Sequence, residues 1–290
     1  MGDSVTPLLI GVDGGGTRCR FGLVVSGARF ETIGPAANAS TDLAGAISSV
    51  QAGIADLAKQ SGVSMSDLSA ARAFVGLAGV LGGPQISAIA AILPTQNAWI
   101  TDDRRAAVAG ALAQDDGLIA GIGTGSFLAR QSAGHVTYLG GWGARLGDEA
   151  SGAWLGRNAL ARVLHGIDGV EALSDLTRDL LAQFGGDTTG IVEFAARATP
   201  QEYAHYARLV ADAADAGDAQ GMALMRAGAE YIARACAALG GRDDTPLCLL
   251  GGVAPRYRSY LGGDLAKRVA DPKGSALDGA LALAAQVPIG

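Results

Sequence analysis

Residues Leu9–Arg20 read LIGVDGGGTRCR, and this stretch decides how the rest of the chain is interpreted. An apolar run ends there in an acid, three glycines and a threonine, and a second apolar run, Phe21–Val25, follows soon after. Two short apolar runs joined by glycines are typical of a β-hairpin. Because glycine reaches backbone angles that other residues avoid, such a turn can aim several N–H groups at one point.

The residues of this turn suit a bound anion. Gly14, Gly15 and Gly16 would offer main-chain N–H groups to a phosphate, and the Thr17 hydroxyl would add another donor. Asp13, at the end of the first strand, would hold Mg²⁺ through water, because hard cations prefer oxygen ligands. A plain hairpin turn with an acid beside it explains the same residues, and this stretch alone leaves both interpretations open.

The same pattern returns further along the chain. Residues Leu118–Ala129 read LIAGIGTGSFLA, which is again an apolar strand, a glycine–threonine turn and a resumed strand. Two matching hairpins indicate an ancient duplication that produced two similar lobes.

Between and after the hairpins, strands alternate with helices. This alternation predicts an α/β protein with a largely parallel sheet core, whose working groups gather at the carboxyl ends of strands. The helix Leu43–Gln60 is expected to be capped by Ser40 or Thr41, and the closing helix by Ser275. The expected strands after the first hairpin are Glu31–Gly34, Ala71–Leu77, Asn97–Thr101 and Thr245–Leu250, and the later helices are Arg104–Ala113, Val170–Phe184, Ile191–Ala198, Pro200–Ala216, Asp218–Leu239 and Gly274–Ala284.

Several polar or glycine residues follow the predicted strands. Asp102 continues the strand Asn97–Thr101 directly. Asn38 either forms a turn or faces a ligand, and Asp148 either caps the next helix or serves a site. Gly251 and Gly252 end the strand Thr245–Leu250, where they allow either the close approach of a flat ligand such as adenine or tight packing.

Composition excludes several classes of protein. The 290 residues suffice for one large or two ordinary domains, and a net charge of −6 without a basic stripe argues against nucleic-acid binding. The chain lacks an apolar run of about 18 residues, so we expect no membrane span. Met1–Thr6 fits the loose N-myristoylation pattern but leaves little tether before the first strand. Three scattered cysteines predict neither disulfides nor zinc, and a cytoplasmic location is the default.

Taken together and in this order, these segments resemble the sugar kinase/heat-shock-protein-70/actin superfamily. Within it they look most like the BadF/BadG/BcrA/BcrD group, which includes N-acetylglucosamine kinase. The likeness runs from Gly11 to Ala284. The motifs that carry it are, in order, a first phosphate motif at Gly11–Thr17, a second at Gly123–Ser126, the most specific match at Gly140–Gly143 with Leu146–Gly152, and an adenosine motif at Leu249–Val253.

The resemblance implies a two-lobed ribonuclease H-like (actin/hexokinase-like) α/β fold with duplicated mixed-sheet lobes and ATP in the cleft between them. It also implies that the closing helix returns to the first lobe. The N-terminal lobe would then comprise residues 1–113 and 274–290, and the C-terminal lobe residues 114–273. A homodimer is compatible with the same likeness.

Residue roles follow from the resemblance as expectations. Asp102 falls on the position of the catalytic base, with Asp103 as the runner-up. The sugar would be held by Asn38, Gly141, Trp142 and Asp148. The nucleotide would be held by Asp13, Gly14, Gly15, Gly16 and Thr17 of the first hairpin, by Gly123, Thr124, Gly125 and Ser126 of the second, and by Gly251 and Gly252.

The activity implied is ATP- and Mg²⁺-dependent phosphorylation of a sugar hydroxyl, with N-acetylglucosamine converted to its 6-phosphate as the preferred reaction. Glucosamine is the alternative substrate. Two other classes of protein remain as alternatives, an ATPase that activates a redox enzyme and a non-catalytic sugar-binding regulator. Redox activators of this group carry a bridging iron–sulfur cluster on cysteines, and no cysteine here lies directly after the second hairpin, since the next one is Cys236.

Overall fold

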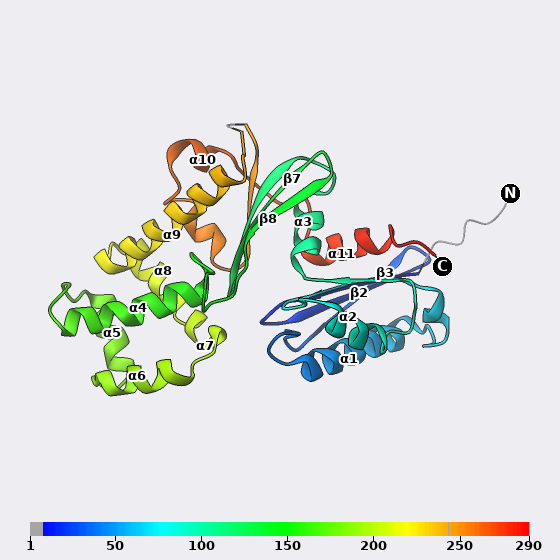
Figure 1. Ribbon diagram of the computed structural model, residues 1–290, viewed down its shortest axis with the longest axis horizontal. Helices are drawn as coiled ribbons and strands as arrows, with labels where there is room; N and C mark the ends of the chain where they lie inside the picture. The colour runs from blue at the N-terminus through cyan, green and yellow to red at the C-terminus, as the bar shows by residue number, and fades with distance from the viewer. Residues whose placement is uncertain (1–7, 243, 290) are drawn as a thin grey trace. The chain divides into compact units, whose positions relative to one another are not determined.

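The computed structural model describes residues 8–242 and 244–289 (Figure 1). The chain divides into two compact units. The first runs to Gln114 and resumes at Pro272, and the second spans Asp115–Asp271. The Met1–Thr6 pattern lies outside the described residues. Among the helices that are described, none is both long and apolar enough to cross a membrane.

The first unit contains a five-stranded sheet in the order β3-β2-β1-β4-β5. Strands β1, β2 and β3 pair antiparallel, whereas β1, β4 and β5 pair parallel. The prediction of a largely parallel sheet was therefore wrong, because short turns join the hairpin strands and such turns permit only antiparallel pairing. The strands are β1 (Leu9–Gly14), β2 (Cys19–Val25), β3 (Ala28–Gly34), β4 (Arg72–Leu77) and β5 (Ala98–Thr101).

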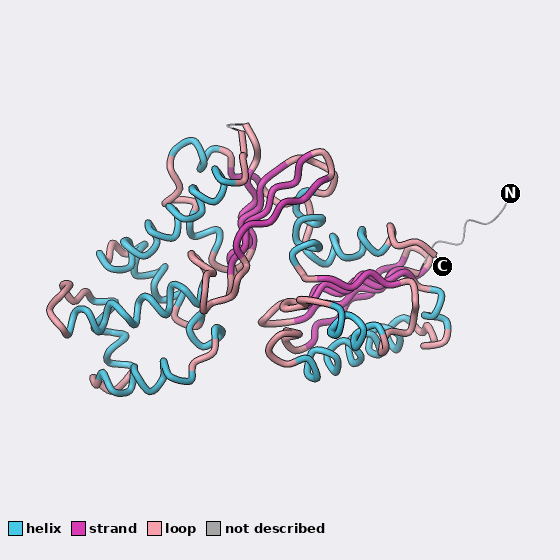
Figure 2. The backbone as a smooth tube through the Cα atoms, viewed as in Figure 1, coloured by secondary structure: helices cyan, strands magenta, loops and turns pink. Residues whose placement is uncertain are grey.

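Helices cover both faces of this sheet (Figure 2). The helices α1 and α2 pack on one face, and α3 and α11 pack on the other, where α11 contacts both β1 and α3. Close packing there depends on glycine, because a Cβ on Gly279 would lie 2.0 Å from the carbonyl oxygen of Ala106. The helices are α1 (Leu43–Ser61), α2 (Gly83–Ala90), α3 (Arg104–Leu112) and α11 (Ala276–Ala284), with a 3-10 turn at Asp67–Ala70.

One of the two predicted helix caps in this unit is correct. Ser275 caps α11 in a reciprocal capping box with Asp278. The predicted cap of α1 at Ser40 or Thr41 is wrong, because Asp42 accepts the Gly45 N–H at 2.8 Å instead. Asp42 directly precedes the first helical residue, Leu43, and its side chain can therefore reach the N–H groups of the first turn.

The second unit repeats the sheet of the first. Read from β8, its order β8-β7-β6-β9-β10 has the same two antiparallel and two parallel pairings. The predicted duplication into two mixed sheets is thus confirmed. The strands are β6 (Gly117–Ile122), β7 (Ser126–Ser132), β8 (His135–Gly140), β9 (Leu247–Leu250) and β10 (Val269–Ala270).

A run of helices separates β8 from β9 in the second unit. The predicted helix Val170–Phe184 begins only at Asp175, because Ser174 and Thr177 form a capping box there. The predicted helix Pro200–Ala216 is two helices that break at His205 and Tyr206. The helices are α4 (Gly152–Ile167), α5 (Asp175–Gln183), α6 (Thr188–Arg197), α7 (Pro200–Ala204), α8 (Ala207–Asp215), α9 (Ala219–Ala238) and α10 (Gly263–Lys267), with a 3-10 helix η2 at Ala254–Tyr257.

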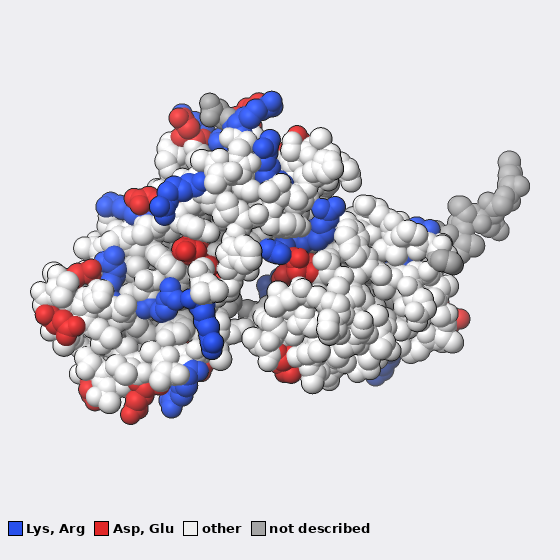
Figure 3. Space-filling view, in the orientation of Figure 1, with Lys and Arg blue, Asp and Glu red and all other residues white. Residues whose placement is uncertain are grey.

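Charged side chains of both signs are interspersed on the face shown in Figure 3, and they form no continuous basic band there. The cores lie beneath this surface. Each sheet is buried on its central strands, since β6 is buried at every residue and β1 and β4 at every residue but the first.

Candidate functional site

The first glycine hairpin places an acid and a base opposite each other. In the pairing of β1 with β2, Asp13 lies across from Arg20, whose Nη1 is 2.9 Å from Asp13 Oδ2. Asp13 is only 7% exposed, and burial raises the pKa of its carboxyl group, although Arg20 and Arg18 counteract this shift. The turn is closed by the Gly15 N–H, which donates to the Arg18 carbonyl at 3.1 Å.

At Gly14, space and not an unusual backbone angle favours glycine, whereas a Cβ on Gly15 would lie 3.5 Å from the Arg18 carbonyl oxygen, an ordinary contact. Neither Gly14 nor Gly15 has a positive φ. A Cβ on Gly14 would lie 2.3 Å from Leu77 Cδ2 of the neighbouring strand. The expected use of left-handed angles is therefore absent at these two positions.

The loop that carries Asn38 is attached to this hairpin. The Ala37 N–H donates to the Gly15 carbonyl at 3.2 Å, and Asn38 forms a parallel bridge with Ala78 after β4. Asn38 Oδ1 accepts from the N–H and hydroxyl of Ser40, at 3.0 and 2.8 Å, so Asn38 does form a turn. No hydrogen bond among the described residues uses its Nδ2, which leaves that amide group available to a ligand.

Two adjacent acids end β5 and begin α3, and their environments differ. Arg104 binds both carboxylate oxygens of Asp102, with Nε 2.8 Å from Oδ1 and Nη2 3.2 Å from Oδ2. Asp103, at the N-cap of α3, makes no capping bond with its side chain. Burial, followed by the nearby charges of Asp13 and Asp102, raises the pKa of Asp103 to about 7. The Asp103 carboxyl group therefore holds a proton more tightly than an ordinary aspartate.

The acids of this unit fit a magnesium ion only if water and ligand oxygens complete its shell. Among residues 8–242 and 244–289, no group of three or more His, Cys, Asp or Glu side chains is arranged to hold a metal. Mg²⁺ commonly binds through one or two carboxylates together with water and substrate phosphates. Asp13 offers one such carboxylate, with a lone pair beyond its bond to Arg20.

The second hairpin, in the other unit, is fixed by hydrogen bonds of its backbone. The Gly123 N–H donates to the Gly125 carbonyl at 2.9 Å. The carbonyls of Gly123 and Thr124 accept the first N–H groups of α4, from Gly152 at 2.8 Å and Ala153 at 3.0 Å. These bonds satisfy helix donors that have no partner within the helix.

Asp148 ties the loop before α4 to this hairpin. Its carboxylate is 7% exposed and accepts the backbone N–H groups of Ser126 and Gly143, while burial raises its pKa. A Cβ on Gly125 would lie 2.7 Å from Asp148 Oδ2, so only glycine leaves room for the carboxylate. The alternative that Asp148 caps α4 is wrong, because Ser151 is the cap and accepts the Trp154 N–H at 3.1 Å.

The same loop has a constrained backbone and an exposed aromatic ring. Gly141 has a φ of 75°, and Asp148 and Ala150 also adopt positive φ values, of 59° and 66°. Non-glycine residues rarely occupy this region unless their surroundings hold them there. Trp142 is 76% exposed, so its ring is accessible to a ligand. Ser126 is buried, and its hydroxyl donates to the Glu149 carbonyl at 2.7 Å.

The end of β9 packs against the second hairpin. Gly251 has a φ of 97°, and a Cβ there would lie 2.4 Å from the Ile122 carbonyl oxygen, so tight packing requires this glycine. The Val253 N–H donates to the same carbonyl at 3.2 Å. A Cβ on Gly252, by contrast, would meet nothing within 4 Å, which leaves room for a flat ligand beside the backbone.

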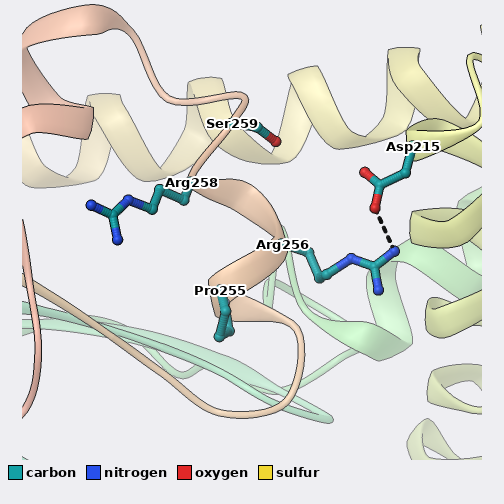
Figure 4. Close-up of a pocket in the computed structure, with 5 residues that line it drawn as sticks. All are labelled: Asp215, Pro255, Arg256, Arg258 and Ser259. Carbon is teal, nitrogen blue, oxygen red and sulfur yellow. Dashed lines mark hydrogen bonds and ion pairs between the residues drawn. The ribbon is translucent and has the colours of Figure 1, made fainter.

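A shallow hollow of about 330 Å³ lies on the η2 side of the second unit (Figure 4). Arg256 is paired there with Asp212 and Asp215, each at 2.7 Å, while the side chain of Arg258, which also lines the hollow, extends away from Arg256. None of the residues predicted to form the site lines this hollow.

Sequence reasoning named the segments described above but missed several hydrogen-bond partners within them. Arg20 could have been found from the hairpin register, because it lies opposite Asp13. Ser151 could have been found as well, because a serine directly before an apolar helix is a typical N-cap. Arg104 left no comparable signal, since its role depends on side-chain direction. Asp102 and Asp103 have different environments, since one is paired with Arg104 and the other is buried, and their adjacent positions in the sequence do not reveal this difference.

Known proteins share this architecture over nearly the whole chain. Glucosamine kinase GspK of Vibrio cholerae serotype O1 is 28% identical over 283 residues, which is 95% of each chain. A crystal structure from Chromobacterium violaceum, provisionally assigned as an N-acetylglucosamine kinase, has a TM-score of 0.87 at 32% identity and covers 97% of this chain and 99% of its own. A ROK family glucokinase from Streptomyces griseus, in complex with glucose and AMPPNP, has a TM-score of 0.56 at 21% identity, covers 96% and 99%, and thus shares the fold.

These likenesses confirm the expected actin/hexokinase-like class of fold, which both structures represent. The model of the BadF/BadG/BcrA/BcrD ATPase family matches residues 10–275, which include both hairpins, the acids after β5 and the glycines after β9. The chain therefore belongs to the BadF/BadG/BcrA/BcrD ATPase family, as its motifs indicated.

Proposed function

We propose that this protein is an ATP-dependent kinase that transfers the γ-phosphoryl group to a hydroxyl of an amino sugar. N-acetylglucosamine, phosphorylated at its 6-hydroxyl, is the preferred substrate, and glucosamine is the alternative because the relative from Vibrio cholerae is a glucosamine kinase. The observation that carries the proposal is the position of Asp103, just after β5 at the start of α3 and near Asp13 of the first hairpin, in a chain of this family. Burial there raises the pKa of the Asp103 carboxyl group to about 7, which suits a general base.

The base we propose is Asp103, in preference to Asp102. A general base works best when its pKa lies near the operating pH, and base assistance contributes roughly a hundred- to ten-thousandfold in rate. Both carboxylate oxygens of Asp102 are already engaged by Arg104. The charge of Asp102 instead raises the pKa of Asp103.

The two hairpins would hold the nucleotide phosphates. Phosphoryl transfer depends mainly on positioning and on neutralising charge. The glycine turns at Gly14–Thr17 and Gly123–Ser126 suit this task because they let a phosphate approach the main chain closely. Asp13 would hold Mg²⁺ through water, and the ion would neutralise the phosphate oxygens when bound. Gly251 and Gly252 would lie against the adenosine.

Four residues are proposed to bind the sugar: Asn38, Gly141, Trp142 and Asp148. The free Nδ2 of Asn38 is a donor for a sugar hydroxyl, and the Asp148 carboxylate retains acceptor capacity beyond its two backbone bonds. The exposed Trp142 ring and the adjacent Gly141 backbone would contact the apolar face of the sugar.

The buried cysteines count against the redox-activator alternative. Cys19, Cys236 and Cys248 are all buried free thiols, and burial raises the pKa of each. A cluster that bridges two chains needs exposed thiolates. The iron content of the purified protein is the measurement that separates this alternative from a kinase.

A coupled assay of ATP consumption across a panel of hexoses and amino sugars tests the proposal. We expect Mg²⁺-dependent turnover with N-acetylglucosamine or glucosamine that exceeds turnover with glucose. Product analysis by NMR would place the phosphate on the 6-hydroxyl. ATP hydrolysis that is independent of every sugar would overturn the proposal.

A further inference from the structure

Tyr257 is a fully buried tyrosine for which the roles proposed above provide no function. It ends η2, the short helix that follows the glycines after β9, and has 0% exposure. Its hydroxyl donates to the carbonyl oxygen of Ala150 at 2.7 Å. Burial raises the pKa of this phenol, so it stays protonated and remains a donor.

The bond from Tyr257 ends at a strained residue in the loop of Asp148. Ala150 has a φ of 66° and is completely buried. Such an angle persists for alanine only where the surroundings impose it. The constraint acts from two sides, because Ser126 donates to the adjoining Glu149 carbonyl while Tyr257 donates to that of Ala150.

These contacts close a ring within the second unit. The segment Gly251–Val253 is bonded to the end of β6 through Ile122, and it continues directly into η2 and Tyr257. Tyr257 bonds the Asp148 loop, and Asp148 in turn bonds the second hairpin at Ser126. One tyrosine hydroxyl therefore connects the segment proposed for adenosine with the loop proposed for the sugar.

The fold also leaves space for the aromatic side chain of Tyr257. A Cβ on Gly228 of α9 would lie 2.4 Å from the Tyr257 hydroxyl oxygen. Glycine in the interior of a long helix is less stable than alanine by roughly 0.5–1 kcal/mol. At this position it gives the tyrosine access to Ala150.

We propose that Tyr257 is a positioning residue that couples the nucleotide segment after β9 to the sugar loop Gly140–Gly152. The inference rests on the proposed function. Nucleotide bound at Gly251–Gly252 would fix η2, and the hydroxyl of Tyr257 would then hold Ala150 and keep Asp148 in place. The two ligands would thereby favour each other's binding, since each rigidifies an element that the other requires.

Hydrogen–deuterium exchange on the full chain tests the coupling, with ADP as the probe. In the wild type we expect ADP to slow exchange at residues 251–257 and also at residues 140–152. In Tyr257→Phe, exchange at residues 140–152 should rise about five- to thirtyfold without ligand, the range for a lost buried hydrogen bond. ADP should still protect residues 251–257 of the variant, but no longer the loop.

Tyr203→Phe is the matched control, because it removes a tyrosine hydroxyl bonded to the Ala195 carbonyl at 3.4 Å, outside this ring of contacts. It should behave as the wild type. Equal loop protection in Tyr257→Phe and the wild type would overturn the coupling alone. If ADP protects nothing in the wild type, the proposed function fails together with the inference.

Calorimetry supplies a second readout. In the wild type, ADP and N-acetylglucosamine should each strengthen the binding of the other, and this synergy should disappear in Tyr257→Phe.

Discussion

The two glycine hairpins occupy the same position in two sheets of the same order, yet they are stabilised differently. The first hairpin depends on an ion pair, in which Arg20 compensates the buried Asp13. The second depends on neutral backbone donors and on the Ser126 hydroxyl, which together hold Asp148 and its loop. Duplication thus preserved the backbone, while the chemistry around each turn diverged. The first unit supplies acids with altered proton affinity, and the second supplies a rigid loop.

The largest expected effect concerns the acids of the first unit. Asp103→Asn should lower kcat for the sugar by at least about a hundredfold, because a carboxamide cannot accept the hydroxyl proton. Asp102→Asn is the matched control and should lose less. Steady-state kinetics, with nucleotide affinity measured separately, would distinguish the two variants. A greater loss in Asp102→Asn would return the role of base to Asp102.

The second hairpin should be most sensitive at Gly125. Gly125→Val would place a side chain against the Asp148 carboxylate and should weaken nucleotide binding by about tenfold or more, a typical consequence of displacing a packed binding loop by an ångström. Gly262→Val is the control, since Gly262 lies outside the proposed site and its Cβ would meet nothing within 4 Å. Calorimetry with ADP measures both. Unchanged affinity in Gly125→Val would remove the second hairpin from the nucleotide site.

The raised pKa of Asp103 predicts opposite effects of pH on activity and on stability. Activity requires the ionised carboxylate, so kcat/KM should rise with pH up to about 7 and then level off. Asp102→Asn removes a neighbouring negative charge, so the rise of kcat/KM, the acidic limb of the pH-rate profile, should move to lower pH. A pH-rate profile of both proteins measures the shift, and an unmoved limb would exclude Asp103 as the group that titrates.

Stability should change in the other direction. The folded protein binds the Asp103 proton more tightly than the unfolded chain, so this residue contributes most below a pH of about 4 and its contribution declines as pH rises toward 7. Asp103→Asn should lose this dependence and unfold at a higher temperature than the wild type at pH 8. Thermal unfolding at pH 5 and pH 8 compares the two, and equal slopes would contradict the shift.

The comparison also explains which features could be predicted from the sequence. Hairpins and helix ends follow from local rules, so the turn at Gly14–Thr17 and the cap at Ser275 were found directly. Strand pairing in the first unit was predicted less well. A largely parallel sheet was expected, but the chain begins with two hairpins, whose strands pair antiparallel. Side-chain partners were the least accessible, because the bonds of Arg104 and Tyr257 depend on orientation in three dimensions.

The smallest effects should separate the two ways of holding a hairpin. Arg20→Gln would leave the buried Asp13 unpaired and should lower the free energy of unfolding by about 1–3 kcal/mol, whereas Ser126→Ala, which deprives one carbonyl of its donor, should cost about 1 kcal/mol. The dependence of these losses on salt concentration distinguishes the two variants more clearly than the size of the losses does. Because Arg20 is partly exposed, the loss in Arg20→Gln should shrink between about 0.05 and 0.5 M salt as screening weakens the ion pair in the wild type. The loss in Ser126→Ala should not change, since no charge is involved. Urea unfolding of both variants at the two salt concentrations measures this difference, and an equal response to salt would mean that the first hairpin is also held chiefly by neutral hydrogen bonds.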